Sequence, residues 1–390
     1  MCKGGVFLEV TGIICEYNPL HLGHRKQLRL IRERLGADSG IVCLMSGSFV
    51  QRGHPAIVNK MARAEAALRC GADLVLELPV TAAIASAERF AGEGVRILST
   101  MCQRLCFGAE TADGQALMDT AKVLLSPDFS AALREQLDKG LSFPAARQAA
   151  LEFMNLDGGL LSAPNNILAV EYCKAILAQN SPMEPMAILR EGNYHDPAAD
   201  PENPSATAIR TLMGSGDWEA YVPTEAVECF RQQPLHTLAA GERAVLARLR
   251  TMTDEDFEAL PYGSEGLWRK LMHAARREPS LEAVAEAVKS KRYTRTRIDR
   301  MILCAFLGLT AEDLSVPVPY ARVLALNDRG REILKRGRDR IDLPNIGEKL
   351  EHPFQITEDR CDALYGLFAA DSSESPDPKY RVYYQQTLSF

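Results

Sequence analysis

Residues 16–28 read EYNPLHLGHRKQL, and this stretch decides the fold. An apolar segment, 10–16, leads into it, and Leu28, Ile31 and Leu35 follow at the spacing of one face of an α-helix. The sequence therefore predicts a strand that passes through a short turn into a helix, which is the opening of a β-α-β unit.

The same alternation continues through the first half of the chain, where we predict several helices between residues 114 and 178 and further strands at 41–46, 73–78, 104–109 and 186–190. Strands that alternate with helices predict an α/β fold with a doubly wound parallel sheet and right-handed crossovers. In such a sheet the ligand binds beyond the carboxyl ends of the strands, which is where the turn after residue 16 lies.

The second half has a different character. Short helical patterns dominate it, at 238–250, 253–260, 264–277, 280–290 and 294–308, with one short strand at 322–326. We therefore predict two domains, an α/β domain at 1–215 and a mainly α-helical domain at 216–390.

Composition limits the class of protein. With 46% hydrophobic and 25% charged residues the chain is typical of a soluble globular protein, and its net charge of −6 means that any nucleic-acid surface must be local. No apolar run reaches the roughly 18 residues of a membrane-spanning helix, and the first residues lack the layout of a signal peptide. The ten cysteines lack the spacing of a disulfide scaffold, so we expect reduced thiols and a cytoplasmic protein without a membrane partner.

Two histidines, His21 and His24, stand on either side of Gly23 at the expected start of the first helix. Free N–H groups at a helix N-terminus bind phosphate, a glycine permits close approach, and imidazoles stabilise charge on a phosphorus under attack. Asn18 and Pro19 are expected to fix the turn. Two alternatives remain open: incidental histidines, and a zinc pair, although Cys102 and Cys106 do not complete one.

Other polar residues are expected at the carboxyl ends of the later strands. Arg52, Lys60 and Arg63 follow the second strand and can reach an anion, or they can form a solvated basic loop. Gly108 ends another strand, where it permits adenine or ribose to lie against the backbone or merely serves a turn.

Two more segments carry candidate nucleotide ligands. Asn165 and Asn166 precede an apolar helix, where one can be an N-cap and the other can bind adenine or ribose. Arg190 ends a strand before Tyr194, His195 and Asp196 and can contact nucleotide or form a surface ion pair. Ser205, Thr207 and Arg210 can cap a helix and hold the β- and γ-phosphates.

Several ordered stretches strengthen this interpretation. The HLGH segment resembles the HxGH motif of nucleotidyltransferases of the HIGH superfamily. GIICEYNPLHLGH, MSGSFVQRGHPAIVNKMARAEAALRCGADLVLELP, CFGAE, PNNILAVEY, SATAIR, KRYTRTRIDRM and PYARVLALNDRGREIL resemble, in sequence and in order, the bacterial tRNA(Met) cytidine acetate ligases. No Gly-Lys dipeptide occurs, which excludes a Walker A loop.

The resemblance implies a HIGH-type α/β domain and ATP-dependent activation of acetate to acetyl-adenylate, with Mg²⁺ on the triphosphate and no metal site made by the protein alone. The acetyl group would then pass to the wobble cytidine of elongator tRNA(Met) and give N4-acetylcytidine. The catalytic residues implied are His21, His24 and Lys60. The ATP-binding residues implied are Ile14, Glu16, Asn18, Pro19, His21, Gly23, His24, Gln27, Gly108, Asn165, Asn166, Arg190, Ser205, Thr207 and Arg210.

The chain departs from the family pattern at three positions. Leu20 and Leu22 stand where the family usually has Phe and Asn, and Asn59 stands where it has Asp. Leu22 is the variable letter of HxGH, so the phosphate chemistry is unaffected. The missing carboxylate at Asn59 leaves no charge role there.

A basic cluster near residue 295 is the candidate tRNA surface. Its members are Lys289, Lys291, Arg292, Arg295, Arg297 and Arg300, with Asp299 as the one acid in the same stretch. Such density in an acidic chain predicts contacts with an RNA backbone, and a solvated face is the alternative. Two other functions remain open: a different HIGH-family adenylyltransferase that acts on a small phosphorylated cofactor precursor, and an RNA-binding protein without catalysis.

Overall fold

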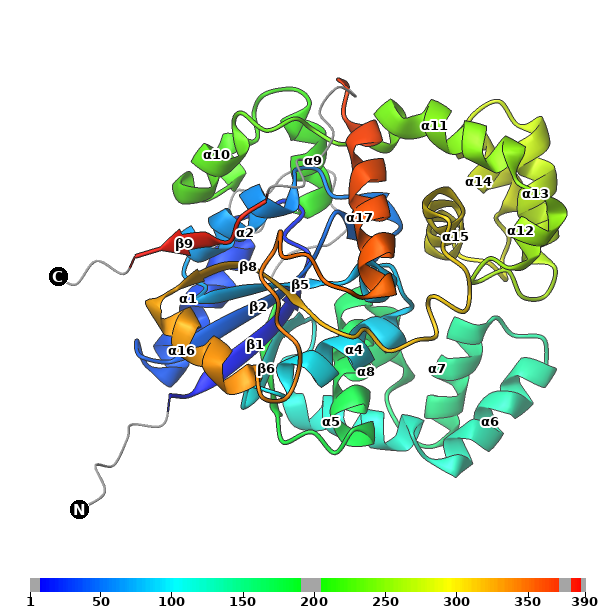
Figure 1. The fold of residues 1–390 in the computed structure, drawn as a ribbon. Helices are drawn as coiled ribbons and strands as arrows, with labels where there is room; N and C mark the ends of the chain where they lie inside the picture. The colour runs from blue at the N-terminus through cyan, green and yellow to red at the C-terminus, as the bar shows by residue number, and fades with distance from the viewer. Residues whose placement is uncertain (1–7, 191–204, 372–379, 387–390) are drawn as a thin grey trace, which may run out of the picture.

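The computed structural model describes residues 8–190, 205–371 and 380–386. Its centre is a sheet that, among these residues, has seven strands in the order β7-β6-β1-β2-β5-β8-β9 (Figure 1). A small antiparallel pair, β3 with β4, follows β2. The strands are β1 (Val10–Cys15), β2 (Gly40–Ser46), β3 (Phe49–Val50), β4 (His54–Pro55), β5 (Leu74–Leu78), β6 (Arg104–Ala109), β7 (Glu184–Leu189), β8 (Arg322–Asn327) and β9 (Tyr383–Gln385).

The five strands predicted from the first half of the chain are confirmed. Strands β7, β6, β1, β2 and β5 are neighbours and run parallel. Their ends agree with the predicted ends to within two residues, and β6 agrees at both ends. The topology is that of a doubly wound α/β sheet, because the crossovers between these strands contain helices.

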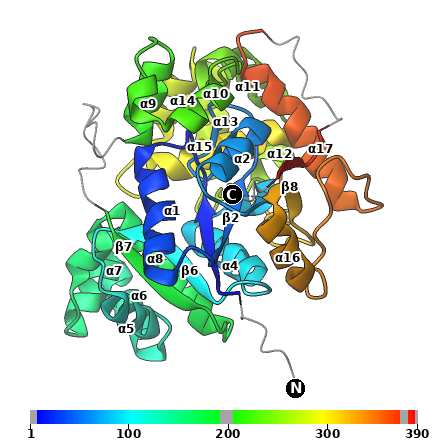
Figure 2. The same ribbon diagram turned by 90° about the vertical axis from the view of Figure 1, so that its left-hand side faces the viewer.

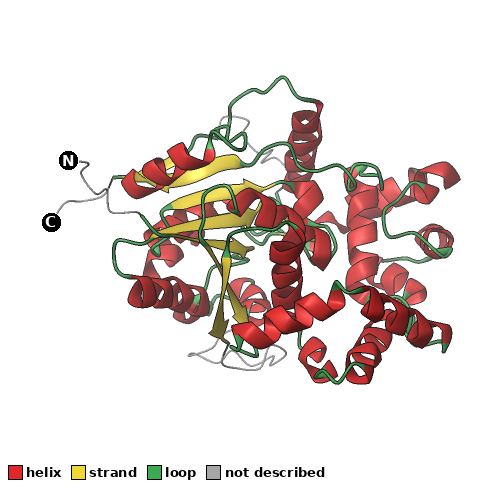
Figure 3. Ribbon diagram, turned by 90° about the horizontal axis from the view of Figure 1, so that it is seen from below, coloured by secondary structure: helices red, strands yellow, loops and turns green. Residues whose placement is uncertain are grey.

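Helices of the first half cover both faces of this sheet (Figure 3). On one face β2 residues such as Val42 and Leu44 pack with α4 and α8, and on the other Ile41 and Cys43 pack with α1 and α2. Apolar side chains on both faces explain why the strands read as continuous hydrophobic runs. The helices are α1 (Leu22–Leu35), α2 (Lys60–Arg69), α3 (Val80–Ala83), α4 (Ala87–Leu98), α5 (Gly114–Leu124), α6 (Pro127–Asp138), α7 (Phe143–Phe153), α8 (Pro164–Ala178), α9 (Ala206–Met213) and α10 (Thr224–Phe230), with 3₁₀ turns η1 (Gly158–Ser162) and η2 (Glu219–Tyr221).

The later helices form a second core beside the sheet domain, on the right in Figure 1. Leu271, Ile298 and Leu303 are buried in it, and Phe49 from β3 joins them. The helices of this core are α11 (Leu238–Thr251), α12 (Asp254–Glu258), α13 (Leu267–Arg277), α14 (Leu281–Val288), α15 (Arg295–Leu307) and α17 (Pro353–Tyr365), followed by η3 (Gly366–Phe368). Helix α16 (Asp328–Gly337) instead packs against the sheet.

The second half of the chain is not helical throughout. The short strand predicted at 322–326 is β8, and it pairs antiparallel with β5 of the sheet domain. Strand β9 then pairs with β8. A division at residue 215/216 therefore does not separate the sheet from the helices, because the chain returns to complete the sheet. No helix in the described ranges is long and apolar enough to cross a membrane.

Candidate active site

The two histidines lie together at the N-terminus of α1. The helix begins at Leu22, and His21 is its N-cap, with an extended backbone. The Nδ1 atom of His21 accepts a hydrogen bond from the N–H of Gly23 at 3.1 Å, and Nδ1 of His24 accepts one from the N–H of His21 at 3.3 Å. The two rings stack with 3.7 Å between their centroids. A capping box of imidazoles thus replaces the usual Ser or Asp cap.

This capping geometry fixes the proton on each ring. Because Nδ1 is an acceptor in both histidines, a neutral imidazole carries its hydrogen on Nε2. Burial, with smaller contributions from Arg190 and Arg210, lowers the pKa of His21 to about 3. Burial and the neighbouring His21 lower the pKa of His24 well below its ordinary value. Both rings are therefore neutral near pH 7 and have an Nε2–H available as a donor.

The Nε2–H group of His21 is buried, and it has no hydrogen-bond partner among the described residues. An unpaired buried donor costs about 1–3 kcal/mol unless something accepts its hydrogen. A phosphate oxygen is such an acceptor, and the free N–H groups of the first turn of α1 favour the same anion.

The turn before His21 is held rigidly. The Asn18–Pro19 peptide bond is cis. The side chain of Asn18 is buried and accepts the N–H of Ile57 at 2.7 Å. The carboxylate of Glu16 accepts the N–H of Gln51 at 2.9 Å. Asn18 and Pro19 lie in a turn, as expected, and the side chains of Asn18 and Glu16 bind the protein's own backbone.

Helix α9 lies beside this turn (Figure 2). Ser205 caps the helix by accepting the N–H of Ala208 at 3.1 Å. Arg210 donates to the carbonyl of Asn18 at 2.8 Å and to the hydroxyl of Thr207 at 3.0 Å. The structure thus brings the SATAIR segment to the HLGH segment, and Arg210 joins them.

The asparagine pair lies at the start of α8, but neither residue is its N-cap. That position is Ala163, which offers no side-chain cap. The carboxylate of Glu110 takes over, accepting the N–H groups of Asn165 at 3.3 Å and Asn166 at 2.8 Å. The expectation that one asparagine caps the helix is wrong, because Glu110 from the end of β6 fills that place. Glu110 is the last residue of the CFGAE stretch, and no local pattern indicates that it caps a helix.

The side chains of the two asparagines have different surroundings. Asn166 is buried and is fully engaged with Thr111, accepting its N–H at 3.0 Å and donating to its hydroxyl at 3.2 Å. Asn165 is part-buried, donates to Glu110 at 2.6 Å and accepts from Arg190 at 3.2 Å. Asn165 therefore links Arg190 to the end of β6.

Gly108, Gln27 and Ile14 are the remaining residues expected to contact ATP, and they lie in β6, α1 and β1. Gly108 lies in β6 with open space where a Cβ would stand, so its backbone is free to contact a ligand. Gln27 donates to the sulfur of Cys106 in the same strand at 3.6 Å. Ile14 is buried in β1 against Gly94 of α4. Tyr194, His195 and Asp196 lie outside the described residues.

Lys60 and Arg63 differ from the expectation that both reach an anion. Lys60 is fully buried and donates to Glu77 at 2.7 Å and to Asp362 of α17 at 2.6 Å. Arg63 is also fully buried and donates to the carbonyls of Glu16, Ser46, Gly47 and Val58. All three guanidinium nitrogens of Arg63 and the ammonium of Lys60 are thus engaged by the protein itself.

These contacts favour a positioning role for Lys60 over the direct catalytic role expected for it. Arg63 holds the ends of β1 and β2 together through the carbonyls of Glu16 and Ser46. Local sequence could not reveal either pairing, because Asp362 lies 302 residues from Lys60 along the chain.

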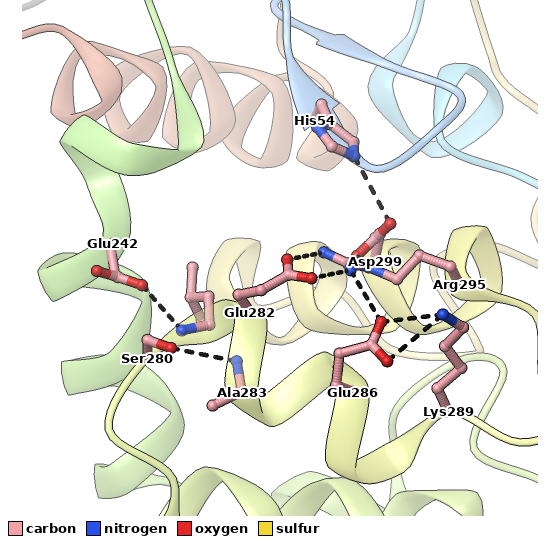
Figure 4. A network of polar contacts seen from close by, with 10 residues as sticks. His54, Glu242, Ser280, Glu282, Ala283, Glu286, Lys289, Arg295 and Asp299 are labelled. Atoms are coloured by element: carbon pink, nitrogen blue, oxygen red, sulfur yellow. Dashed lines mark hydrogen bonds and ion pairs between the residues drawn. The ribbon is translucent and has the colours of Figure 1, made fainter. Parts of the chain in front are cut away.

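The basic cluster near residue 295 is largely paired with acids from other segments (Figure 4). Arg295 forms ion pairs with Glu282 at 2.7 Å and Asp299 at 2.8 Å, and Lys289 pairs with Glu286 at 3.0 Å. Asp299 also faces His54 of β4 at 3.6 Å. The stretch itself contains one acid, Asp299, and the fold places Glu282 and Glu286 beside it.

Three of the other four members of the cluster also contact groups of the protein. Arg292 pairs with Glu265 at 2.7 Å. Arg297 donates to the carbonyl of Tyr262 at 2.7 Å, and Arg300 stacks over the Tyr262 ring at 5.0 Å. Lys291 is exposed. The cluster stays a predicted tRNA surface, but the acids around it remove much of the charge argument for it.

The site lies at the carboxyl ends of a doubly wound sheet. It combines a helix start capped by histidine with a second helix that carries an arginine, as in nucleotidyltransferases of the HIGH class. Residues 8–374 match the family model described as HIGH Nucleotidyl Transferase. Within that class, the chain belongs to the tRNA(Met) cytidine acetate ligase family.

The relatives and solved structures support this placement. The tRNA(Met) cytidine acetate ligase of Acetivibrio thermocellus is 35% identical over 369 residues, covering 87% of this chain and 88% of the relative. That of Clostridium novyi is 36% identical over 357 residues, covering 86% and 89%. The structure of Thermotoga maritima TmcAL bound with alpha-thio ATP is 30% identical, with a TM-score of 0.85, and covers 97% of this chain and 100% of that one.

Proposed function

We propose that this protein is an ATP-dependent ligase that converts acetate to acetyl-adenylate and transfers the acetyl group to the wobble cytidine of elongator tRNA(Met), giving N4-acetylcytidine in the cytoplasm. The names of the relatives support the substrates, and the solved structure with alpha-thio ATP supports the nucleotide. The observation that carries the proposal in this chain is the neutral histidine pair, whose Nε2–H donors stand at a helix N-terminus.

In the first step an acetate oxygen attacks the α-phosphorus of ATP, and pyrophosphate leaves. The Nε2–H groups of His21 and His24 donate to the phosphate oxygens, on which negative charge grows in the transition state. Arg190 and Arg210, both close enough to lower the pKa of His21, neutralise the phosphates. No covalent protein nucleophile is required, since positioning and charge stabilisation suffice.

The adenosine would lie against β6. The open face of Gly108 accepts a planar ring or a ribose, and Asn165 stands beside it at the start of α8. Ile14, Glu16 and Gln27 complete the proposed contacts from β1 and α1. Mg²⁺ would accompany the triphosphate, because in nucleotide sites it binds through phosphate oxygens and water with few protein ligands. No cluster of three or more candidate metal ligands occurs in the described residues.

In the second step the exocyclic amine of the cytidine attacks the acetyl carbonyl, the acyl–phosphate bond breaks, and AMP leaves. Anticodon-loop bases are suited to this attack because they are unpaired and can be turned out.

The test is to incubate the protein with labelled acetate and vary the other components. We expect label in elongator tRNA(Met) when ATP is present, without acetyl-coenzyme A. A requirement for acetyl-coenzyme A, or acetate-independent pyrophosphate release triggered by a small phosphorylated acceptor, would contradict the proposal. The second result would identify a different HIGH-family adenylyltransferase. Transcripts in which the wobble cytidine is replaced by uridine are the matched control and should remain unlabelled.

A further inference from the structure

A basic groove lies between α16 and β9, at the opposite edge of the sheet from β6 and β7. Its volume is about 690 Å³, and four cations line it: Arg331, Lys335, Arg338 and Arg381. One carboxylate, Glu348, lines it as well, and its Oε2 accepts the N–H of Asn345 at 3.0 Å. The α16–β9 groove thus has an excess of positive charge in a chain whose net charge is −6.

The helix presents these cations on one side. Arg331, Lys335 and Arg338 stand at positions i, i+4 and i+7, which fall on one face of a helix. Ile333, on the opposite face, is buried against the sheet, and Leu334 is buried beside the cations and lines the groove with them. All three cations are exposed, as is Arg381 from the segment before β9.

The groove cations differ from the cluster near residue 295 in their partners. Within the described ranges no ion pair or side-chain hydrogen bond engages Lys335, Arg338 or Arg381. Arg331 lies 4.0 Å from Asp328 and stacks over the ring of Tyr384 at 4.7 Å. Three full charges therefore remain available to an external anion.

Aromatic rings accompany the charge. Tyr380 and Tyr384 line the same groove, and Tyr384 is 41% exposed. Tyr380 is half-buried, and the Arg331 guanidinium already covers one face of the Tyr384 ring. Cations beside a partly exposed aromatic ring are found on surfaces that bind nucleic acids, where a base or ribose can stack on the ring. An acidic peptide would use the cations but would gain little from the rings.

The groove is remote from the histidine pair. It lies three strands from β1 across the sheet, and α16 follows β8, whose end pairs with Leu74 at the amino end of β5. Neighbouring strands lie ~4.8 Å apart and each residue adds ~3.3 Å along a strand, so the groove lies roughly 25 Å from the histidine pair. A mononucleotide cannot reach from one site to the other, whereas a folded RNA can.

We propose that the α16–β9 groove binds the phosphate backbone of the tRNA substrate while an unpaired base lies in the histidine site. This inference rests on the proposed function and deepens it, because it places the RNA contact on the side of the sheet opposite α11–α15 (Figure 1). The groove holds the macromolecule and takes no part in adenylate formation.

The test is a triple variant, Lys335→Ala with Arg338→Ala and Arg381→Ala, measured for tRNA affinity across a salt series. Each lost phosphate contact should flatten the slope of log affinity against log salt by about 0.7–0.9, so the triple variant should flatten it by roughly 2–3. Affinity at physiological salt should fall by about tenfold or more. Acetate-dependent pyrophosphate release without tRNA should be unchanged, which also shows that the variant is folded.

The matched control replaces three exposed cations of the other cluster, Lys289, Lys291 and Arg292, with Ala. If the groove carries the main backbone contacts, the control's salt slope should change little, because Lys289 and Arg292 are already paired with Glu286 and Glu265. An unchanged slope in the groove variant, or a large change in the control variant alone, would overturn the inference. Wild-type protein that makes acetyl-adenylate and acetylates tRNA in the same experiment keeps the proposed function intact under either result. Wild-type protein that does neither contradicts the proposed function itself.

Discussion

At the residue scale, His21 both ends the turn and serves the proposed chemistry. Its Nδ1 caps α1, and that bond directs Nε2 toward the place where a phosphate would bind. A Ser or Asp cap would satisfy the helix equally well but would offer no ring N–H. Helix stability alone therefore does not require a histidine here, and the proposed chemistry gives its second ring nitrogen a use.

Two substitutions at His21 should separate these roles. His21→Asn keeps a cap, whereas His21→Ala removes it and should lower the free energy of unfolding by about 1 kcal/mol more than the Asn change. Both should reduce acetate-dependent pyrophosphate release by about 10²-fold or more, because both remove the Nε2–H donor. Denaturant unfolding and initial rates measure the two effects. Near-normal turnover by His21→Asn would show that the ring only caps the helix.

The positions of the histidines, Gly23 and Arg210 at helix starts and on a helix beside the turn could be predicted from the sequence because short motifs carry them. Asn165 and Arg63 could not be described correctly in the same way. Their partners are Glu110, which is 55 residues from Asn165, and backbone carbonyls at the ends of two strands. Spacing along the chain reports which residues share a turn or a helix face, but it does not report which distant group satisfies them.

At the element scale, α17 connects the helical core to the sheet through buried charge. Lys60 of α2 reaches Asp362 of α17 and Glu77 of β5. Glu358, one turn earlier on α17, is buried and accepts the N–H of Val80 at 2.9 Å. Burial and the nearby Glu77 raise the pKa of Glu358 to about 8, so its carboxyl is protonated near neutral pH.

This raised pKa predicts a pH-dependent stability. The folded protein holds the Glu358 proton up to about pH 8, whereas the unfolded chain releases it near pH 4.3. Stability from this group is therefore complete at low pH and is lost as pH rises through that window, by up to about 1.4 kcal/mol per pH unit. Glu358→Gln should remove this loss, since an amide is neutral at every pH.

The measurement is denaturant unfolding of both proteins at pH 5.5 and 8.5. The variant should gain stability relative to wild type between the two values. Equal pH dependence in the two proteins would mean that Glu358 is ionised in the folded state and that Lys60 and Arg322 compensate its charge.

At the scale of the whole molecule, the sequence predicted the parallel sheet but not how it is completed. Strands β1, β2, β5 and β6 are buried on both faces and therefore read as apolar runs. Strand β9 has three residues and is half-exposed, and its partner β8 lies far from it along the chain. Edge strands that form by long-range return leave little local pattern, so a boundary drawn from composition separated segments that fold together.

The distribution of basic residues on the surface also depends on contacts between distant parts of the chain. Three of the six cations near residue 295, Lys289, Arg292 and Arg295, are paired with acids in space, whereas the cations of α16 and Arg381 gather only when β9 returns to the sheet. Local density of Lys and Arg along the chain therefore does not report how many of these cations the fold leaves without a carboxylate.

The central claim is that an acetate oxygen attacks the α-phosphorus of ATP, and oxygen transfer tests it most directly. The protein is supplied with acetate labelled with ¹⁸O in both oxygens, ATP and elongator tRNA(Met), and the AMP is analysed by mass spectrometry. Because the attacking oxygen stays on phosphorus when the acyl bond breaks, the account predicts one ¹⁸O atom in the AMP for each acetyl group transferred. AMP without ¹⁸O, or ADP and labelled inorganic phosphate in its place, would contradict the account.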